Sequence, residues 1–327
     1  MKRYQYSLLA LFAIGAFAVA CKKLPDGFIS SGIRYEESPV TIQQGRLRVS
    51  TALNVDGSSQ PLSIKVLHYY DKATGKIVDD MFAKQYKIKV WTGAYDPLVD
   101  TTVARIQAKQ KDSLVNPITV NKASGQIEAN YTSINIPIGS YQFDLEITNP
   151  AGTKTYPKIG SFDVVTAPTY EIPSPATNGA RKVGDETKNV GLQAPIVTVT
   201  KIGDGDNKVI LKYTDKNGVI FNPAAGEVTY RPQPGLTTGS LQTMKMYAMK
   251  TELFSNRTEF TFGTTPFPLI SLGNGLNYYY RIPTQYLKFD NPALPNDQYS
   301  ANPRFSFQSF QPGIYEITVK LPDVTHR

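Results

Sequence analysis

Polar and apolar side chains alternate along many short stretches of this chain, and this pattern constrains its fold more than any other feature. Successive residues of a β-strand point to opposite faces, so a period of two is typical of strands buried on one side. Clear examples are the stretches 62–66, 86–90, 141–147 and 209–213. The pattern predicts an all-β protein built from β-sandwiches.

Turn signals lie between these stretches and support the same fold class. Asn217-Gly218 is the clearest, because this dipeptide accepts the left-handed backbone of a tight hairpin turn. Helical patterning is scarce. The segment 100–111 could form one short helix, with Asp100 or Thr101 as its N-cap.

The alternating stretches fall into two blocks, 40–165 and 193–327. The segment between them, 166–192, contains prolines at 168, 173 and 175 and then a charged run. Proline fixes its backbone angle and offers no N–H to a sheet, so this segment is interpreted as a linker between two sandwich domains. The alternative is a long loop within one large sandwich.

The N-terminus has the parts of a secretory signal, which we assign to residues 1–20. Two basic residues at 2 and 3 precede an apolar run, 8–20, that is too short to cross a membrane. Cys21 follows directly and is the only cysteine in the chain. Residues 21–39 then suggest an extended tether. The alternative to an acylated Cys21 is ordinary secretion with a free thiol.

The four residues from Ala18 to Cys21 resemble a lipobox, the cleavage and acylation signal of bacterial lipoproteins. The resemblance implies that Cys21 carries lipid and that the mature protein is anchored to a membrane, because several acyl chains together anchor a protein stably. Lys22 follows, where an Asp would favour retention in the inner membrane. An outer-membrane location is therefore expected, with the surface and the periplasmic face both left open.

Charge and residue content argue against several function classes. After removal of the signal, 33 basic side chains face 27 acidic ones, and they are spread evenly over both blocks. Nucleic-acid binding requires a one-sided basic stripe, so it is not expected. The two histidines, His68 and His326, have no cysteine cluster near them, and the loop at Asp204 is better explained as a polar hairpin than as a calcium site. We expect no metal and no cofactor.

No catalytic motif is present either. The chain lacks a G-x-S-x-G nucleophile motif, and its acidic residues form no recognisable glycosidase pair. An enzyme is therefore not expected.

Aromatic residues offer the strongest indication of a binding site. Fourteen Phe and Tyr side chains lie between Phe254 and Tyr315. Aromatic residues at strand spacing usually fill a core, but three consecutive tyrosines must point to both faces of a strand. At least one should then meet solvent or a ligand, with Asn277 nearby to bond hydroxyls. The candidate ligand-binding residues are Tyr278, Tyr279, Tyr280, Arg281 and Tyr299.

The segment 118–155 carries a family resemblance. Its Ser124-Gly125 turn and the Tyr141 strand after Gly139 resemble cadherin-like and other immunoglobulin-like bacterial modules. The whole chain resembles the tandem immunoglobulin-like lipoproteins of the Bacteroidota, including those encoded beside outer-membrane nutrient transporters.

This resemblance implies two immunoglobulin-like β-sandwich domains in tandem. It also implies a non-enzymatic accessory or glycan-binding role, with a glycan or an outer-membrane transporter as partner. The alternative is a structural or adhesive envelope module that binds a protein.

Overall fold

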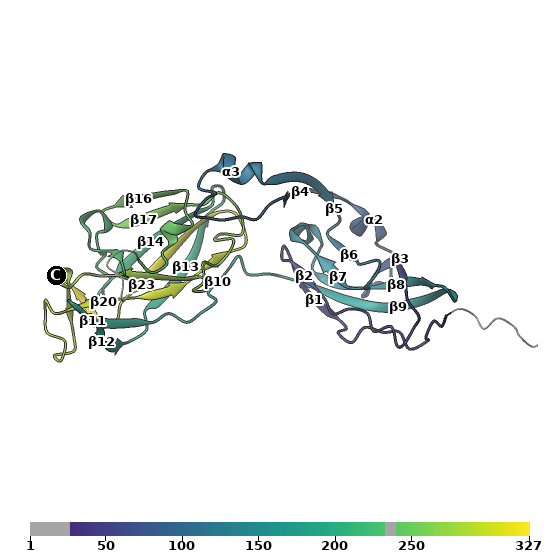
Figure 1. Ribbon diagram of the computed structural model, residues 1–327, viewed down its shortest axis with the longest axis horizontal. Coiled ribbons are helices and arrows are strands. Elements are labelled where there is room, and N and C mark those ends of the chain that lie inside the picture. Colours follow the sequence, from purple (N-terminus) through teal and green to yellow (C-terminus); the bar gives the residue numbers. More distant parts are fainter. Residues whose placement is uncertain (1–26, 233–239) are drawn as a thin grey trace, which may run out of the picture. The chain divides into compact units, whose positions relative to one another are not determined.

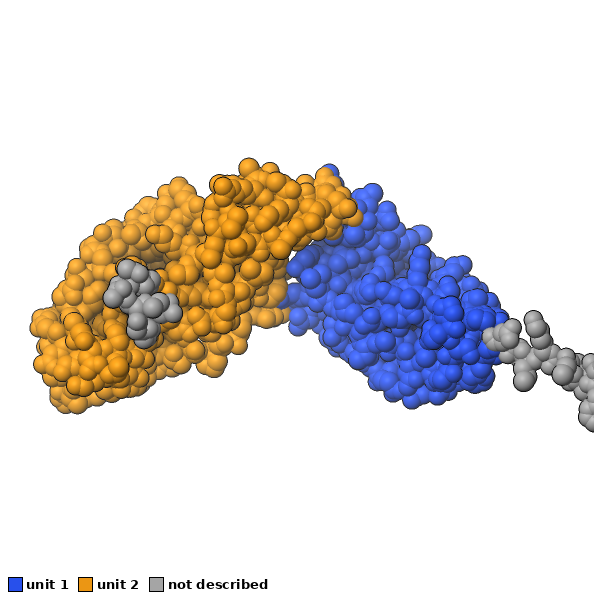
Figure 2. Space-filling model, viewed as in Figure 1, with its two compact units in different colours: residues 1–88, 114–167 blue, residues 89–113, 168–327 orange. Residues whose placement is uncertain are grey.

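The computed structural model describes residues 27–232 and 240–327, and it consists mainly of β-strands (Figure 1). The predicted all-β class is confirmed. The described residues form two compact units (Figure 2): unit 1 holds 27–88 and 114–167, and unit 2 holds 89–113 and 168–327. Within these ranges no helix is long and apolar enough to cross a membrane. The signal at 1–20 and the acylation predicted at Cys21 lie outside the described residues.

Unit 1 contains two sheets. The larger has the order β1-β9-β8-β3, with β1 Val40–Gln43, β3 Ser63–Asp71, β8 Gly139–Asn149 and β9 Gly152–Val165. The smaller has the order β2-β7-β6, with β2 Arg48–Val49, β6 Ile118–Val120 and β7 Ile127–Ala129. The short helices are α2 Asp79–Ala83 and the 3-10 turn η1 Tyr131–Asn135.

Both sheets of unit 1 bury their apolar faces in one core. Along β8 every second side chain is buried, from Tyr141 to Ile147, while the residues between them are partly exposed. Ile118 and Ile127 of the smaller sheet belong to the same apolar cluster. Burying one such side chain contributes about 1.5–3 kcal/mol, so the period-two pattern is the main source of stability here.

A long hairpin interrupts unit 1. Its strands are β4 Tyr86–Trp91 and β5 Gln110–Val115, and helix α3 Val103–Ala108 lies between them. The predicted helix exists, but its N-cap is Thr102, whose hydroxyl oxygen accepts a hydrogen bond from the Arg105 N–H at 3.3 Å. Asp100 is not the cap because its carboxylate is occupied by the Asp96 N–H and the Lys109 ammonium.

The described residues of unit 2 form five sheets besides the β4–β5 hairpin. The largest has the order β13-β23-β14-β17-β16, with β13 Ile196–Gly203, β14 Lys208–Thr214, β16 Lys250–Phe254, β17 Arg257–Thr261 and β23 Ile314–Lys320. Two three-stranded sheets have the orders β15-β18-β21 and β12-β11-β20, with β11 Asn178–Lys182, β12 Asp185–Leu192, β15 Thr229–Tyr230, β18 Asn277–Arg281, β20 Tyr299–Ala301 and β21 Arg304–Ser306.

The remaining elements of unit 2 are short. Two strand pairs join β10 Tyr170–Glu171 to β22 Gln308–Ser309 and β19 Leu287–Phe289 to β24 Val324–His326. Three 3-10 turns are η2 Pro223–Ala225, η3 Met244–Met246 and η4 Thr284–Tyr286. The predicted turn at Asn217-Gly218 follows β14, where Gly218 has a left-handed φ of 88° and the Asp215 carboxylate accepts the Asn217 N–H.

The segment predicted to be a linker, 166–192, instead contributes β10, β11 and β12 to unit 2. Ala180 at the centre of β11 is completely buried. The prolines are confined to the connections that flank β10, so they do not interrupt the strands. The charged run begins at the end of β11, the central strand of its sheet, and continues into β12, an edge strand, and edge strands are commonly protected by charged side chains. Polar composition here therefore reflects a sheet edge.

The predicted tether, 21–39, also differs from expectation over its described part. Ile33 and Tyr35 are buried in the core of unit 1, and the Tyr35 hydroxyl donates to the backbone oxygen of Gly125 at 2.6 Å. Arg34 pairs with Asn54 through both backbone hydrogen bonds. The apolar residues of this segment do not recur at a regular spacing, because individual side chains pack into the core and the segment does not form a continuous strand.

Candidate functional site

The three consecutive tyrosines lie on β18, the central strand of the sheet β15-β18-β21, and they point to opposite faces of it. Tyr278 and Tyr280 are buried, with 0% and 7% of their surface exposed. Tyr279 and Arg281 lie on the other face and are half-buried. The prediction that the strand separates these rings is confirmed, and Tyr279 is the ring that solvent can reach.

Tyr278 and Tyr280 are not placed to bind a ligand, because both serve the core of unit 2. The Tyr278 hydroxyl donates to the Phe307 backbone oxygen at 3.0 Å, and the Tyr280 ring stacks on Phe305. The Tyr280 hydroxyl accepts the N–H of Met244 at 3.2 Å. Burial raises the pKa of both phenols above the ordinary value. Aromatic residues at strand spacing fill the core here.

Tyr299 also points away from Tyr279 and Arg281. It lies on β20 opposite Lys182 of β11, whereas its neighbour Ser300 lies opposite Arg181. Directly opposed residues share a face of a sheet and successive residues alternate. Ser300 is therefore on the same face as Arg181, and Tyr299 is on the other.

Strand register brings further arginines to the face that carries Tyr279. Arg304 of β21 lies directly opposite Tyr279, and Thr229 of β15 lies opposite Arg281. Arg231 follows two residues after Thr229. We call this surface the arginine face and define it by the following residues: Arg181, Glu186, Arg231, Asn277, Tyr279, Arg281, Ser300, Asn302 and Arg304.

Two of its arginines are held by hydrogen bonds to Glu186 and Asn302. Arg281 donates from Nη2 to Glu186 Oε1 at 2.6 Å and from Nε to Asn302 Oδ1 at 2.8 Å. Arg181 donates from Nη1 to the backbone oxygen of Glu186, also at 2.6 Å. Arg281 is 16% exposed, so this is a partly desolvated and rigid network.

Arg231 lies among these charges without an ion pair of its own among the described residues. Burial is the main cause that lowers the pKa of its guanidinium, and the positive charge of Arg181 adds to the effect. Its Nε is buried and has no hydrogen-bond partner within the described ranges, and the same holds for Arg304 Nε and Glu186 Oε2. Buried polar atoms are nearly always paired, so this concentration marks the face as unusual.

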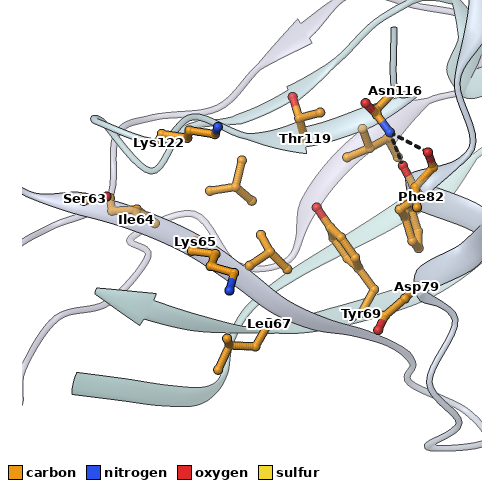
Figure 3. A pocket seen from close by; sticks show the side chains of 14 residues that line it. Ser63, Ile64, Lys65, Leu67, Tyr69, Asp79, Phe82, Asn116, Thr119 and Lys122 are labelled. Carbon is orange, nitrogen blue, oxygen red and sulfur yellow. Dashed lines mark hydrogen bonds between the residues drawn. The ribbon is translucent and has the colours of Figure 1, made fainter. Parts of the chain in front are cut away.

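Unit 1 has a groove of about 520 Å³ between strands β3 and β6 (Figure 3). The Tyr69 ring stacks on Phe82 with ring centres 4.3 Å apart, and Asn116 closes one end by donating to the backbone oxygens of Phe82 and Ala83. Lys65 and Lys122 also line the groove. Tyr69 lies between the strands in Figure 3. The groove is mainly apolar, and few polar side chains converge in it to orient a ligand.

In the part of the chain that the structure describes, no three His, Cys, Asp or Glu side chains lie close enough together to hold a metal ion. Asp204, the residue of the polar hairpin loop, pairs with Lys201 at 2.6 Å.

The sequence analysis named Tyr279 and Arg281 as candidates but not the residues that surround them. Arg181, Glu186, Arg231 and Arg304 come from four separate segments, and only strand pairing brings them together. A signal for the partly exposed face of β18 was present, because Asn277, Tyr279 and Arg281 alternate with the aromatic Tyr278 and Tyr280. No sequence pattern pointed to the three other arginines.

Comparison with known proteins adds little to this picture. No protein-family model and no curated protein matches the chain. Among solved structures, a SusE-like surface-located polysaccharide-binding protein from the heparin utilisation locus of Bacteroides thetaiotaomicron is 9% identical over 88% of this chain and 53% of that one, with a TM-score of 0.26. The N-terminal four Ig domains of Dscam1 isoform 4.44 are 8% identical over 89% and 54%, with a TM-score of 0.20.

This chain spans about half the length of these two solved chains. A third, the C-terminal domain of an AgI/II polypeptide of Streptococcus agalactiae, has a TM-score of 0.15. All three scores are far below 0.5, so neither fold nor function is inferred from them.

Proposed function

We propose that this protein is a non-enzymatic lipoprotein of the bacterial outer membrane that binds a glycan on the arginine face. The observation that carries this proposal is the position of Tyr279, whose half-buried ring lies opposite Arg304 and on the same face as Arg281. An accessible ring beside fixed hydrogen-bond donors is what a sugar requires, because its C–H face stacks and its hydroxyls bond.

The polar groups of the face suit hydroxyl recognition. Arg281 donates a hydrogen bond from Nε to Asn302 Oδ1 and is held by it, so little side-chain freedom would be lost on binding. Asn277 Oδ1 is a buried acceptor with no partner among the described residues. Acceptor and donor groups of this kind lie on both sides of the Tyr279 ring along β18 and β21.

Binding is favoured over hydrolysis because the face carries a single carboxylate. Glycoside hydrolases use two carboxyl groups across the scissile bond. Glu186 is the acidic member of the arginine face, and one of its oxygens already accepts a charge-assisted hydrogen bond from Arg281. It is therefore placed to orient an arginine rather than to transfer a proton.

A glycan array followed by titration calorimetry tests this function. Tyr279→Ala should weaken binding of the captured glycan by about 1–3 kcal/mol, a typical stacking contribution, with little loss of stability. Tyr279→Phe should retain most of the affinity because the ring remains.

Tyr230→Ala is the matched control, since Tyr230 is 60% exposed and lies on β15 opposite Tyr280, on the face away from Tyr279. It should bind normally. If no glycan binds, or if both alanine variants lose affinity equally, the arginine face is not the glycan site, and an adhesive module with a protein partner becomes the better explanation.

A further inference from the structure

The arginine face has more positive charge than its own acidic residue can neutralise. Burial lowers the pKa of the Arg231 guanidinium, and the positive charges of Arg181 and Arg281 lower it further, while the carboxylate of Glu186 raises it. Three guanidinium groups therefore share one carboxylate. Arg281 donates to the carboxylate of Glu186, and Arg181 donates to the backbone oxygen of Glu186. Arg304 lies on the same face, so four arginines oppose one carboxylate and the excess is three positive charges, on side chains that are all only partly exposed.

This arrangement costs stability. Like charges repel more strongly where water is partly excluded, and burial further disfavours the charged form of Arg231. An arginine stays protonated in proteins, so the cost is not relieved by loss of a proton. Its Nε, buried and without a partner among the described residues, adds the penalty of an unmade hydrogen bond.

A ligand that supplies negative charge would offset the repulsion among these arginines. A carboxylate or sulfate has several acceptor oxygens in one plane or cone, and a guanidinium matches such groups with paired N–H donors. Within the described residues, the Arg231 side chain takes no part in the hydrogen bonds that join Arg181 and Arg281 to Glu186 and Asn302, so its donors are the least used on this face. Tyr279 lies on the same face of the sheet.

We propose that the arginine face binds an acidic polysaccharide, with Arg231 holding the anionic group of a sugar whose ring stacks on Tyr279. The anionic group is a carboxylate or a sulfate ester, which share the acceptor geometry that Arg231 recognises. This inference rests on the proposed glycan-binding function and specifies the class of glycan.

The test uses the full chain without its signal and four polymers: polygalacturonate, its carboxyl-reduced neutral form, dextran sulfate and neutral dextran. Binding is measured by titration calorimetry at two salt concentrations. We expect at least one acidic polymer to bind. Its affinity should be about tenfold or more above that of its neutral counterpart, because a hydrogen bond to a charged group changes affinity by about this factor. The preferred polymer distinguishes carboxylate from sulfate.

Arg231→Gln should lose about tenfold or more in affinity for the acidic polymer. Its melting temperature should stay the same or rise, because the substitution removes a repelling charge. A purely structural arginine would behave in the opposite way, with a lower melting temperature. Arg231→Lys should retain part of the affinity, since it keeps the charge but not the paired donors.

Arg34→Gln is the control for net charge, because Arg34 is an exposed arginine of unit 1 whose side chain pairs with Glu36. If this variant loses as much affinity as Arg231→Gln, the polymer binds through overall charge and the proposal is wrong. If neutral polymers bind as well as acidic ones and depend on Tyr279, glycan binding stands and the anionic class is wrong. If no polymer binds, both proposals fail.

Discussion

At the scale of single residues, the tyrosines of unit 2 occupy two kinds of position, one partly exposed and one completely buried. Tyr279 is accessible, whereas Tyr213 and Tyr278 are fully buried. The Tyr278 hydroxyl has a backbone partner, but the Tyr213 hydroxyl has none among the described residues. Burial raises the pKa of both phenols well above the usual value, because a phenolate would lose its hydration in the core.

This burial predicts that the folded state is destabilised by alkali. Between the ordinary tyrosine pKa of about 10 and the raised values, the unfolded chain releases protons that the folded chain keeps. The stability present at neutral pH should therefore fall as the pH rises above about 10, by about 1.4 kcal/mol per pH unit for each buried tyrosine. Denaturant unfolding of unit 2 between pH 8 and 11.5 measures the slope.

Two Phe variants serve as controls for this prediction. Tyr213→Phe should reduce the slope and leave stability at pH 7 unchanged or higher, because its hydroxyl is buried without a partner. Tyr278→Phe should reduce the slope too but cost about 1 kcal/mol at pH 7, since it loses the bond to Phe307. If neither substitution changes the slope, the loss of stability above pH 10 does not come from Tyr213 and Tyr278.

At the scale of elements, the most informative is helix α3 with its flanking hairpin. Residues 89–113 lie in the first half of the sequence, yet they belong to unit 2. Ile106 of α3 is 2% exposed, and its Cδ1 is so near Gly263 that a β-carbon there would lie 2.5 Å from it. The close approach explains glycine at 263, and it makes α3 part of the packing of unit 2.

Ile106→Ala should therefore destabilise unit 2 by about 2–4 kcal/mol, the usual range for removing a buried aliphatic side chain. Val103→Ala on the same helix is the control, because Val103 is 47% exposed and should change stability by well under 1 kcal/mol. Thermal unfolding followed by tyrosine fluorescence and near-ultraviolet dichroism would report both. Equal, small effects would show that α3 does not stabilise unit 2.

At the scale of the whole molecule, the chain passes between the two units three times, after residues 88, 113 and 167. The units are therefore not consecutive in sequence, although each has its own apolar core. The chain also carries an N-terminal segment, outside the described residues, whose lipobox-like Cys21 bears on where the protein is held.

We expect Cys21→Ala to release the protein from the bacterial membrane fraction. Several acyl chains on Cys21 would hold the wild-type protein stably, whereas the unacylated variant has no comparable anchor. Immunoblots of membrane and soluble fractions, with metabolic labelling by a fatty acid, give the measurement. Unchanged partition of the variant, or wild-type protein without label, would mean that Cys21 is not acylated.

Sequence patterning predicted the local structure of this protein well. Strands such as β8 can be recognised from the alternation of polar and apolar residues, because a half-buried sheet requires apolar residues at every second position. The Asn217-Gly218 turn is equally local, since Gly218 supplies the left-handed geometry. The same reasoning showed that Tyr279 must point away from Tyr278 and Tyr280.

Only the tertiary structure decided which face of β18 meets the core and what gathers on the other face. Strand pairing between segments about 100 residues apart placed Arg181 with Arg281, and it turned the proline-rich stretch 166–192 into strands of unit 2. Such pairings depend on long-range burial, which is a property of the assembled fold and leaves no period in the sequence. The sequence by itself therefore determined the strands, and the fold determined the arginine face.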